Sequence, residues 1–365
     1  MFRFASQLLP LVLLFVFSGI CSANPVTEGE LNQALDYLKE AVKAPEGDPD
    51  RGGMETLLSY LDGVAPNQKV WETDDEAWGT GVGVSFTINS SLAKLMGYLY
   101  NPSIAVEAVI PGVVRSETEN RWIGNGDYQA FTSLADSPIT VRRDYRMAIT
   151  PDGNSGAYYT YDQHELTTAG VWQGRRFLLT VSYQPEASDV GRKGYPVATR
   201  EGGEIYSYSG KKGLTLMGLG WVDSYIYKSI AITLYVEREP GSSSLKGLSF
   251  KWLKAGWKGA NMVKDYHIEN GIVRFAEHLN FFLNQETAPT PQALAEICDR
   301  VKSLSTEALK GVFAQQIAIM VDPDEKNADR LGADYIDGMT REDLISGVIS
   351  NHSVGLLLGT GTVSF

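Results

Sequence analysis

The chain has 365 residues, of which 43% are hydrophobic, 21% charged and 10% aromatic. This composition is typical of a globular protein and excludes a disordered chain, a collagen-like repeat and a small disulfide scaffold. The 32 Lys and Arg residues against 44 Asp and Glu residues leave a net charge of −12, which repels phosphate backbones, so we expect no nucleic-acid partner.

Residues 1–23 have the pattern of a secretory signal peptide, with one early charge, an apolar run over 8–17 and small residues up to Ala23. The run is shorter than the roughly 20 apolar residues that cross a bilayer. We therefore expect cleavage after Ala23 and secretion, into the periplasm. The alternative is a lipoprotein anchored through Cys21, which is disfavoured because Ile20 stands where such signals carry a small residue.

The region 24–79 is predicted to be helical. Thr27 and Glu30 have the spacing of a capping box at the start of a helix that ends before Pro45. A second short helix is expected over 54–61.

From residue 80 the pattern changes to strands. Val82, Val84, Phe86 and Ile88 alternate with small or polar residues, which predicts a strand with one buried face. A short helix follows over 92–100. Further strands are predicted at 121–132, 139–149, 156–165, 175–184, 204–209, 214–219 and 225–236. Turn sequences at 151–154 and 210–213 join neighbouring runs, which favours an antiparallel meander.

After residue 240 the pattern is read as helical again, with Trp252 and Trp257 leading into a long helix over 268–283. Its apolar residues recur every three or four positions and predict one face packed on the sheet: Ile268, Ile272, Phe275, Leu279 and Phe282. The polar residues Glu269, Arg274 and Glu277 are expected on the opposite side.

Residues 286–365 are predicted to form a C-terminal helical extension. One helix opens at Pro289 and Pro291, and another begins at Thr340. Cys298 lies in a helical pattern and would be the only cysteine after signal cleavage. We expect it to be a buried, inert thiol without a disulfide partner.

No catalytic or metal signature is present in the sequence. It has no nucleophile elbow, Walker loop or dinucleotide fingerprint. His164-Glu165 begins like a zinc-protease motif, but Thr168 stands where the second histidine should be. We therefore expect no metal ion and no cofactor.

The segment 139–147 allows two interpretations. On a strand, Arg143 and Tyr145 share one face. One interpretation buries Arg143 beside a ligand head group, between apolar walls. The other places Arg142, Asp144 and Arg146 in a ladder of paired surface charges.

Tyrosines are frequent in the strands that follow. Tyr159, Tyr161 and Tyr225 can line a cavity, because a tyrosine has an apolar body and a polar tip. They can equally be ordinary half-buried strand residues. Trp221 follows two glycines, Gly218 and Gly220, which predict a bulge or a bend of the sheet.

The order of these elements resembles the START-like (SRPBCC, helix-grip) lipid-binding superfamily. The residues that carry the resemblance are 137–145 in a middle strand, 230–236 in the predicted last strand, and the passage 240–247 that leads to the closing helix. The resemblance covers about 80–285. It implies an α+β fold in which a curved antiparallel sheet grips a long C-terminal helix, with helical extensions at both ends. It also implies an elongated apolar cavity between sheet and helix.

The leading functional hypothesis is a secreted binding protein for a lipid or another hydrophobic small molecule, in transient contact with membranes at most. The expected ligand-binding residues are Arg143, Tyr145, Tyr159, Tyr161, Trp221, Tyr225 and Phe275. Two alternatives stay open. One is an envelope scaffold with an unknown protein partner, and the other is a hydrolase or lyase that uses Asp144, His164, Glu165 and Asp223 as acid/base groups.

Overall fold

The structure is a computed structural model, and the predicted signal peptide lies outside the residues it describes. These residues are 25–44, 51–123, 131, 138–151, 156–200, 203–216 and 220–359.

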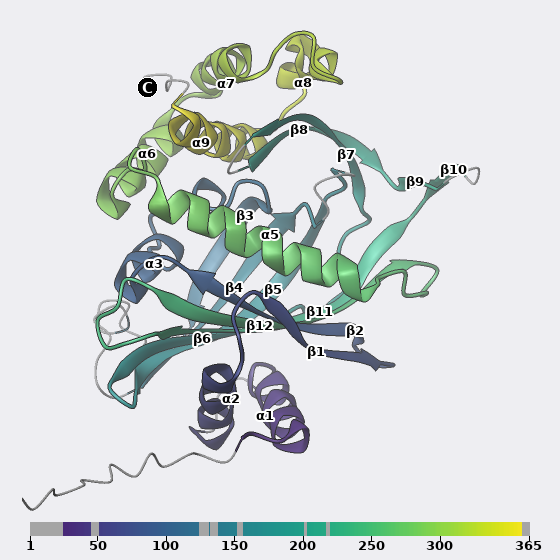
Figure 1. Cartoon of the computed structure of the whole chain (residues 1–365). Helices are drawn as coiled ribbons and strands as arrows, with labels where there is room; N and C mark the ends of the chain where they lie inside the picture. Colours follow the sequence, from purple (N-terminus) through teal and green to yellow (C-terminus); the bar gives the residue numbers. More distant parts are fainter. Residues whose placement is uncertain are drawn as a thin grey trace, which may run out of the picture.

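The fold is α+β and is built on one eight-stranded antiparallel sheet (Figure 1). The strand order is β1-β2-β12-β11-β6-β5-β4-β3, so the sheet is open, with β1 and β3 at its edges. The strands are β1 (Gln68–Asp75), β2 (Gly79–Ile88), β3 (Val114–Ile123), β4 (Ile139–Ile149), β5 (Tyr159–Trp172), β6 (Arg175–Tyr183), β11 (Ser224–Glu237) and β12 (Leu245–Trp257). This confirms the predicted α+β class and the antiparallel pairing.

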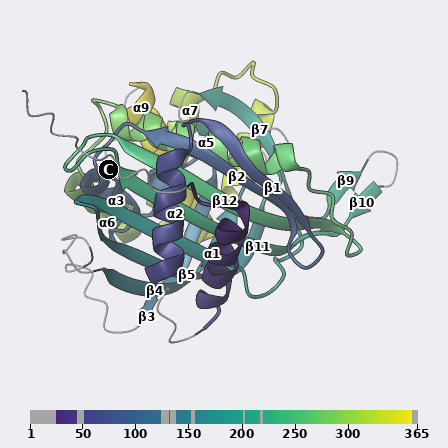
Figure 2. The same cartoon turned by 60° about the horizontal axis from the view of Figure 1, so that its bottom comes forward.

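Two helices cover one face of the sheet, which we call the outer face: α1 (Glu28–Ala41) and α2 (Arg51–Gly63) (Figure 2). The predicted capping box of α1 is present, with Thr27 and Glu30 bonded reciprocally. Strand β1 was not predicted, because its mostly exposed, polar sequence has no regular alternation of apolar residues.

The opposite face, called the inner face, carries α3 (Leu92–Leu99), a short 3-10 turn (Val106–Ala108) and α5 (Asp265–Asn284). The predicted apolar side of α5 packs over β2 and β12. α5 covers one side of β2, and on its other side rings of the neighbouring strand β12, those of Trp252 and Phe250, lie against Gly81 and Gly83. β2 is therefore buried on both sides, and the prediction of one buried face was wrong.

The segment 245–257, predicted to lead into a helix, forms β12, between β2 and β11. Phe250 and Trp252 point to the outer face, and Ser249 and Lys251 point to the inner face. This two-residue period is that of a strand. The last strand of the sheet is therefore β12 and not 230–236.

The other strand predictions agree with the structure to different degrees. The runs at 139–149, 175–184 and 225–236 agree with β4, β6 and β11 within two residues. The run at 121–132 was placed too late, since β3 begins at Val114. Of the predicted turn at 151–154, 152–154 lie outside the described residues, but β4 and β5 pair as a hairpin requires.

A two-stranded arm formed by β7 (Arg192–Arg200) and β8 (Gly203–Lys212) was only partly predicted. The predicted hairpin across 210–213 does not form, because β8 pairs with β7. The next short strand, β9 (Leu214–Leu216), pairs with β10 (Gly220–Val222). Gly218, with its predicted bulge, lies outside the described residues.

The C-terminal region is helical, with α6 (Pro291–Ser303), α7 (Thr306–Met320), a 3-10 turn (Ala328–Leu331), α8 (Ala333–Asp337) and α9 (Arg341–Leu358). Thr340 caps α9 as predicted, but α9 is longer than expected. Cys298 is fully buried, and this burial raises the pKa of its thiol. No helix within the described ranges has the length and apolar character needed to cross a bilayer.

Candidate ligand-binding site

One row of side chains crosses the inner face through the middle of the sheet. The strand register aligns, from β4 through β5, β6, β11 and β12 to β2, the residues Arg143, Glu165, Ser182, Ala231, Lys251 and Val82. Charged groups stand toward both ends of this row, and its centre has only the small side chains of Ser182 and Ala231.

Solvent reaches the centre of this face. Five residues there, which we call the inner strip, are only half-buried: Thr180, Ser182, Ala231, Thr233 and Lys251. On the outer face of the same strands, Val181, Ile230 and Ile232 are 0% exposed. Tyr100, at the end of α3, reaches the strip through a hydrogen bond to Thr180. The small side chains of the strip otherwise leave the inner face less filled than the outer face.

The β4 end of the row is a buried charge network. Arg143 contacts Glu165 through two nitrogens, at 2.7 Å and 3.1 Å, and its Nη1 lies 3.1 Å from Glu117. Burial alone would lower the pKa of Arg143, but the two carboxylates outweigh it and hold that pKa above its ordinary value. Tyr145 donates to Glu165 at 3.0 Å. The carboxylates of Glu165 and Glu117 therefore already engage the predicted head-group residue Arg143.

The charged ladder of the second interpretation occupies the outer face of the same strand. Asp144 lies 2.6 Å from His164, and Arg146 lies 2.8 Å from both Asp162 and Asp189. Alternation therefore separates the acid/base candidates of the enzyme hypothesis, with Asp144 and His164 on one face and Glu165 on the other.

The predicted aromatic residues are brought together only in part. Tyr159 and Tyr161 form a buried cluster with Ile226 on the inner face, and Tyr159 bonds Ser224 at 2.6 Å. Tyr225 lies on the opposite side of β11 from Ile226 and stacks on Tyr227.

Of the two remaining predicted ligand-binding residues, the structure describes the side chain of one. Phe275 of α5 is half-buried against the inner-face core. The side chain of Trp221 lies outside the described part of the chain.

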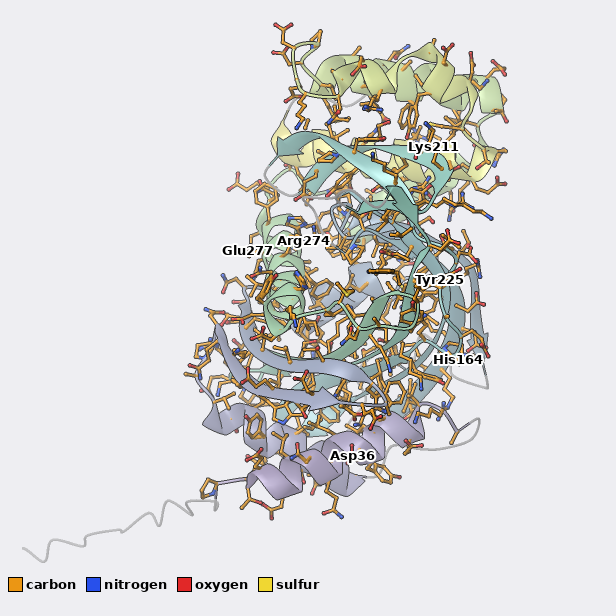
Figure 3. The ribbon with its side chains drawn as sticks, turned by 90° about the vertical axis from the view of Figure 1, so that its right-hand side faces the viewer. Asp36, His164, Lys211, Tyr225, Arg274 and Glu277 are labelled. Atoms are coloured by element: carbon orange, nitrogen blue, oxygen red, sulfur yellow. The ribbon has the colours of Figure 1, made fainter. Side chains whose placement is uncertain are left out.

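Two cationic residues at this face were not predicted as site residues. Lys251 belongs to the inner strip, but the prediction of a helical approach in this segment assigned its side chain to no face of the sheet. Arg274 was expected on the polar side of α5. Instead its Nη2 donates to the carbonyl oxygens of Thr150 and Pro151, at 2.8 Å and 3.1 Å, whereas Glu277 is exposed (Figure 3).

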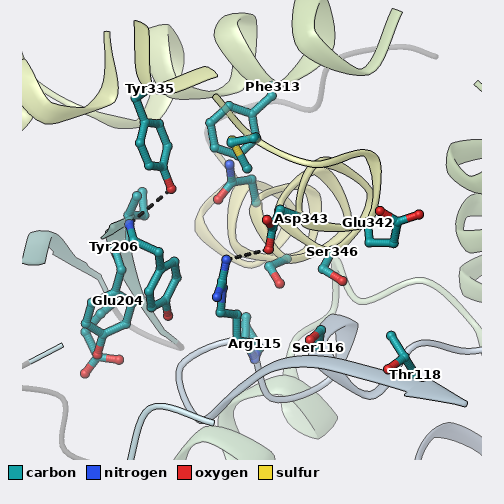
Figure 4. Close-up of a pocket in the computed structure, with 17 residues that line it drawn as sticks. Arg115, Ser116, Thr118, Glu204, Tyr206, Phe313, Tyr335, Glu342, Asp343 and Ser346 are labelled. Carbon is teal, nitrogen blue, oxygen red and sulfur yellow. Dashed lines mark hydrogen bonds and ion pairs between the residues drawn. The ribbon is translucent and has the colours of Figure 1, made fainter. Parts of the chain in front are cut away.

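A separate pocket lies between β3, β8, α8 and α9 (Figure 4). Its volume is about 90 Å³, which suits a few water molecules. Arg115 lies 2.6 Å from Asp343 across it, and its guanidinium stacks on the rings of Tyr158 and Tyr208. None of the predicted ligand-binding residues lines this pocket, and it is far smaller than the roughly 300–1,000 Å³ of drug-sized ligand sites.

No group of three metal-ligating side chains occurs among the residues that the structure describes. The chain matches no protein-family model and no curated protein.

Proposed function

We propose that the protein binds a hydrophobic or amphipathic small molecule, such as a lipid, on the inner face of the sheet beneath α5, in the manner of a helix-grip protein. Secretion through the N-terminal signal would place this activity in the periplasm.

One observation carries the proposal: the contrast in burial between the two faces at the same strand positions. Outer-face residues such as Ile232 are 0% exposed, whereas the adjacent inner-face residue Ala231 is half-buried. In a sheet covered by helices on both faces, packed side chains normally exclude solvent from the centre of each face. A ligand would exclude this solvent and bury apolar surface, which stabilises the complex by roughly 25 cal/mol per Å².

The surroundings of the inner strip suit an amphipathic ligand. Tyr161 and Ile226 give an apolar wall on one side. The half-buried Leu253 packs against this wall and also against the larger inner-face core, where Phe275 lies. The hydroxyl groups of the strip, such as that of Ser182, supply the few polar contacts that orient such ligands.

The test is ligand capture followed by blocking of the strip. Native mass spectrometry of the protein from an envelope fraction, with solvent extraction, would detect a co-purified lipid as a discrete added mass. Titration with the neutral dye N-phenyl-1-naphthylamine would measure binding to the emptied protein. Ala231→Phe would fill the strip, and we expect it to weaken dye binding at least about tenfold, or about 1.4 kcal/mol.

The matched control is Ala77→Phe, the same substitution in an exposed turn, which should leave dye binding unchanged. Ser182→Leu, elsewhere in the strip, repeats the test if Ala231→Phe destabilises the fold. A protein with no added mass that binds no dye contradicts the proposal. So does a dye affinity that neither strip variant changes.

A further inference from the structure

We infer that the bound molecule carries an anionic head group, a carboxylate or a phosphate, held between Lys251 and Arg274. This inference rests on the proposed function and specifies the chemical class of its ligand.

Lys251 is a cation without a counter-ion in the middle of the sheet. It projects from β12 to the inner face, between Ala231 and Val82 in the row, and it is half-buried. Within the described residues, no hydrogen-bond acceptor and no carboxylate pairs with its ammonium group. A lysine is rarely placed this deep in a fold unless something pairs with it.

Arg274 supplies the second cation from α5. The carbonyl oxygens of Thr150 and Pro151 accept hydrogen bonds from its Nη2 and fix its position, but they carry no formal charge. Its Nη1 is buried and has no hydrogen-bond partner. A guanidinium group has five N–H donors, so this side chain can still donate hydrogen bonds to an anion.

The two cations are close enough to affect each other. Desolvation, and after it the charge of Arg274, lowers the pKa of Lys251. Among the described residues, Glu204 is a carboxylate whose pKa the charge of Arg274 lowers, yet burial raises that pKa overall and its Oε2 has no hydrogen-bond partner. Two positive charges against one carboxylate leave an excess positive charge, which an anion between the cations would neutralise.

The rest of the row gives the ligand a direction. At the other end of the row, the carboxylates of Glu165 and Glu117 already engage Arg143, and their negative charges repel an anion. The head group is therefore attracted to Lys251 and Arg274. The hydrocarbon part would then extend along the inner face past Leu253 toward Ile226 and Tyr161, and not toward Glu165.

Three probes with the same chain test this inference: dodecanoate, dodecyl phosphate and dodecan-1-ol, each displacing N-phenyl-1-naphthylamine. The unaltered protein should bind both anions more tightly than the alcohol. Lys251→Met should weaken the binding of both anions about tenfold or more. It should change the affinity for the alcohol less than about twofold, because a charge-assisted contact is lost only for the anions. The anion that binds more tightly, and whose affinity falls more on substitution of Lys251, identifies the head group as carboxylate or phosphate.

The control is Lys254→Met, three residues along the same strand, where the lysine donates to the carbonyl oxygen of Glu76. It should leave all three affinities unchanged. Lys251→Gln, which keeps a polar side chain, should bind the two anions as weakly as Lys251→Met does.

The inference is overturned if the three probes bind equally and Lys251→Met changes none of them, a result that leaves the proposed function standing. If no probe displaces the dye and the dye itself does not bind, the proposed function fails, and the inference fails with it.

Discussion

Arg143 and Glu165 face each other across β4 and β5 and are joined at two points. Nε lies 2.7 Å from Oε1, and Nη2 lies 3.1 Å from Oε2. Their side chains are 10% and 6% exposed, so the pair is almost completely removed from water. A planar guanidinium bonded twice to a carboxylate has a fixed orientation. The pair therefore fixes the positions of both side chains at one end of the inner row.

Substitution of Arg143 should destabilise the fold strongly. Arg143→Met leaves Glu165 buried without the cation it pairs with and removes a partner of Glu117, and breaking a buried pair in this way typically costs about 3–5 kcal/mol. Urea unfolding of the purified variant measures this change in the free energy of unfolding.

The control is Arg146→Met on the outer face of the same strand. Arg146 is 30% exposed and pairs with the exposed carboxylates of Asp162 and Asp189, so its loss should cost no more than about 1 kcal/mol. Equal losses for the two variants would show that the Arg143 network contributes no more than a surface pair.

The sequence predicts elements well where one local signal is strong. The Thr27–Glu30 capping box and the apolar residues of α5, spaced three or four apart, both correspond to helices in the structure. The antiparallel pairing also follows from turn chemistry that joins consecutive strands, as between β4 and β5. Each of these features depends on residues close together in the chain.

The candidate site could not be predicted as completely, because it depends on long-range pairing. β12 lies between β2 and β11, and nothing local in 245–257 identifies that neighbour in β2. Its two tryptophans suggested an apolar segment that leads into a helix. The side chain of Lys251 was therefore not assigned to either face of the sheet. Tyr225 was grouped with Tyr159, but the irregular register between Ile226 and Lys228 and strand alternation separate them.

Glu107 should make stability fall as the pH rises. Burial raises the pKa of this carboxyl to about 7, and Ser346 bonds it at 2.8 Å. The folded state therefore binds more protons than the unfolded state between about pH 4.5 and 7, and stability is lost across that window. Glu107→Gln should remove this slope and raise the free energy of unfolding at pH 8 by up to roughly 3 kcal/mol. Unfolding curves at pH 5 and pH 8 measure both effects, and an unchanged slope would contradict the assignment.

His352 should act in the opposite direction. Burial lowers its pKa to about 4, so the unfolded state binds the extra proton between about pH 6.5 and 4. Stability gained from the neutral ring is then lost as the pH falls through this range. His352→Gln should reduce that loss, as seen in thermal midpoints from pH 7 to pH 4.5. A variant with the same acid sensitivity as the unaltered protein would assign the effect to other groups.

The two faces of β11 should respond differently to substitution. Ile232 is 0% exposed against the outer-face core, so Ile232→Ala removes buried methyl groups and leaves a cavity, at a cost of about 2–5 kcal/mol. Ala231, its neighbour in sequence, is half-buried on the inner face, and Ala231→Ser should change the free energy of unfolding by less than about 0.5 kcal/mol.

Urea midpoints at constant m value give both quantities, because an unchanged m value shows that the same surface is exposed on unfolding. This comparison distinguishes an inner face that solvent reaches from one that is packed, and the measurement needs no ligand. If Ala231→Ser costs as much as a core substitution, the inner face is closed around Ala231, because only a buried site penalises a new hydroxyl without a partner. A small cost together with a large loss for Ile232→Ala means that the inner face has room for a ligand and that the outer face carries the stability of the sheet.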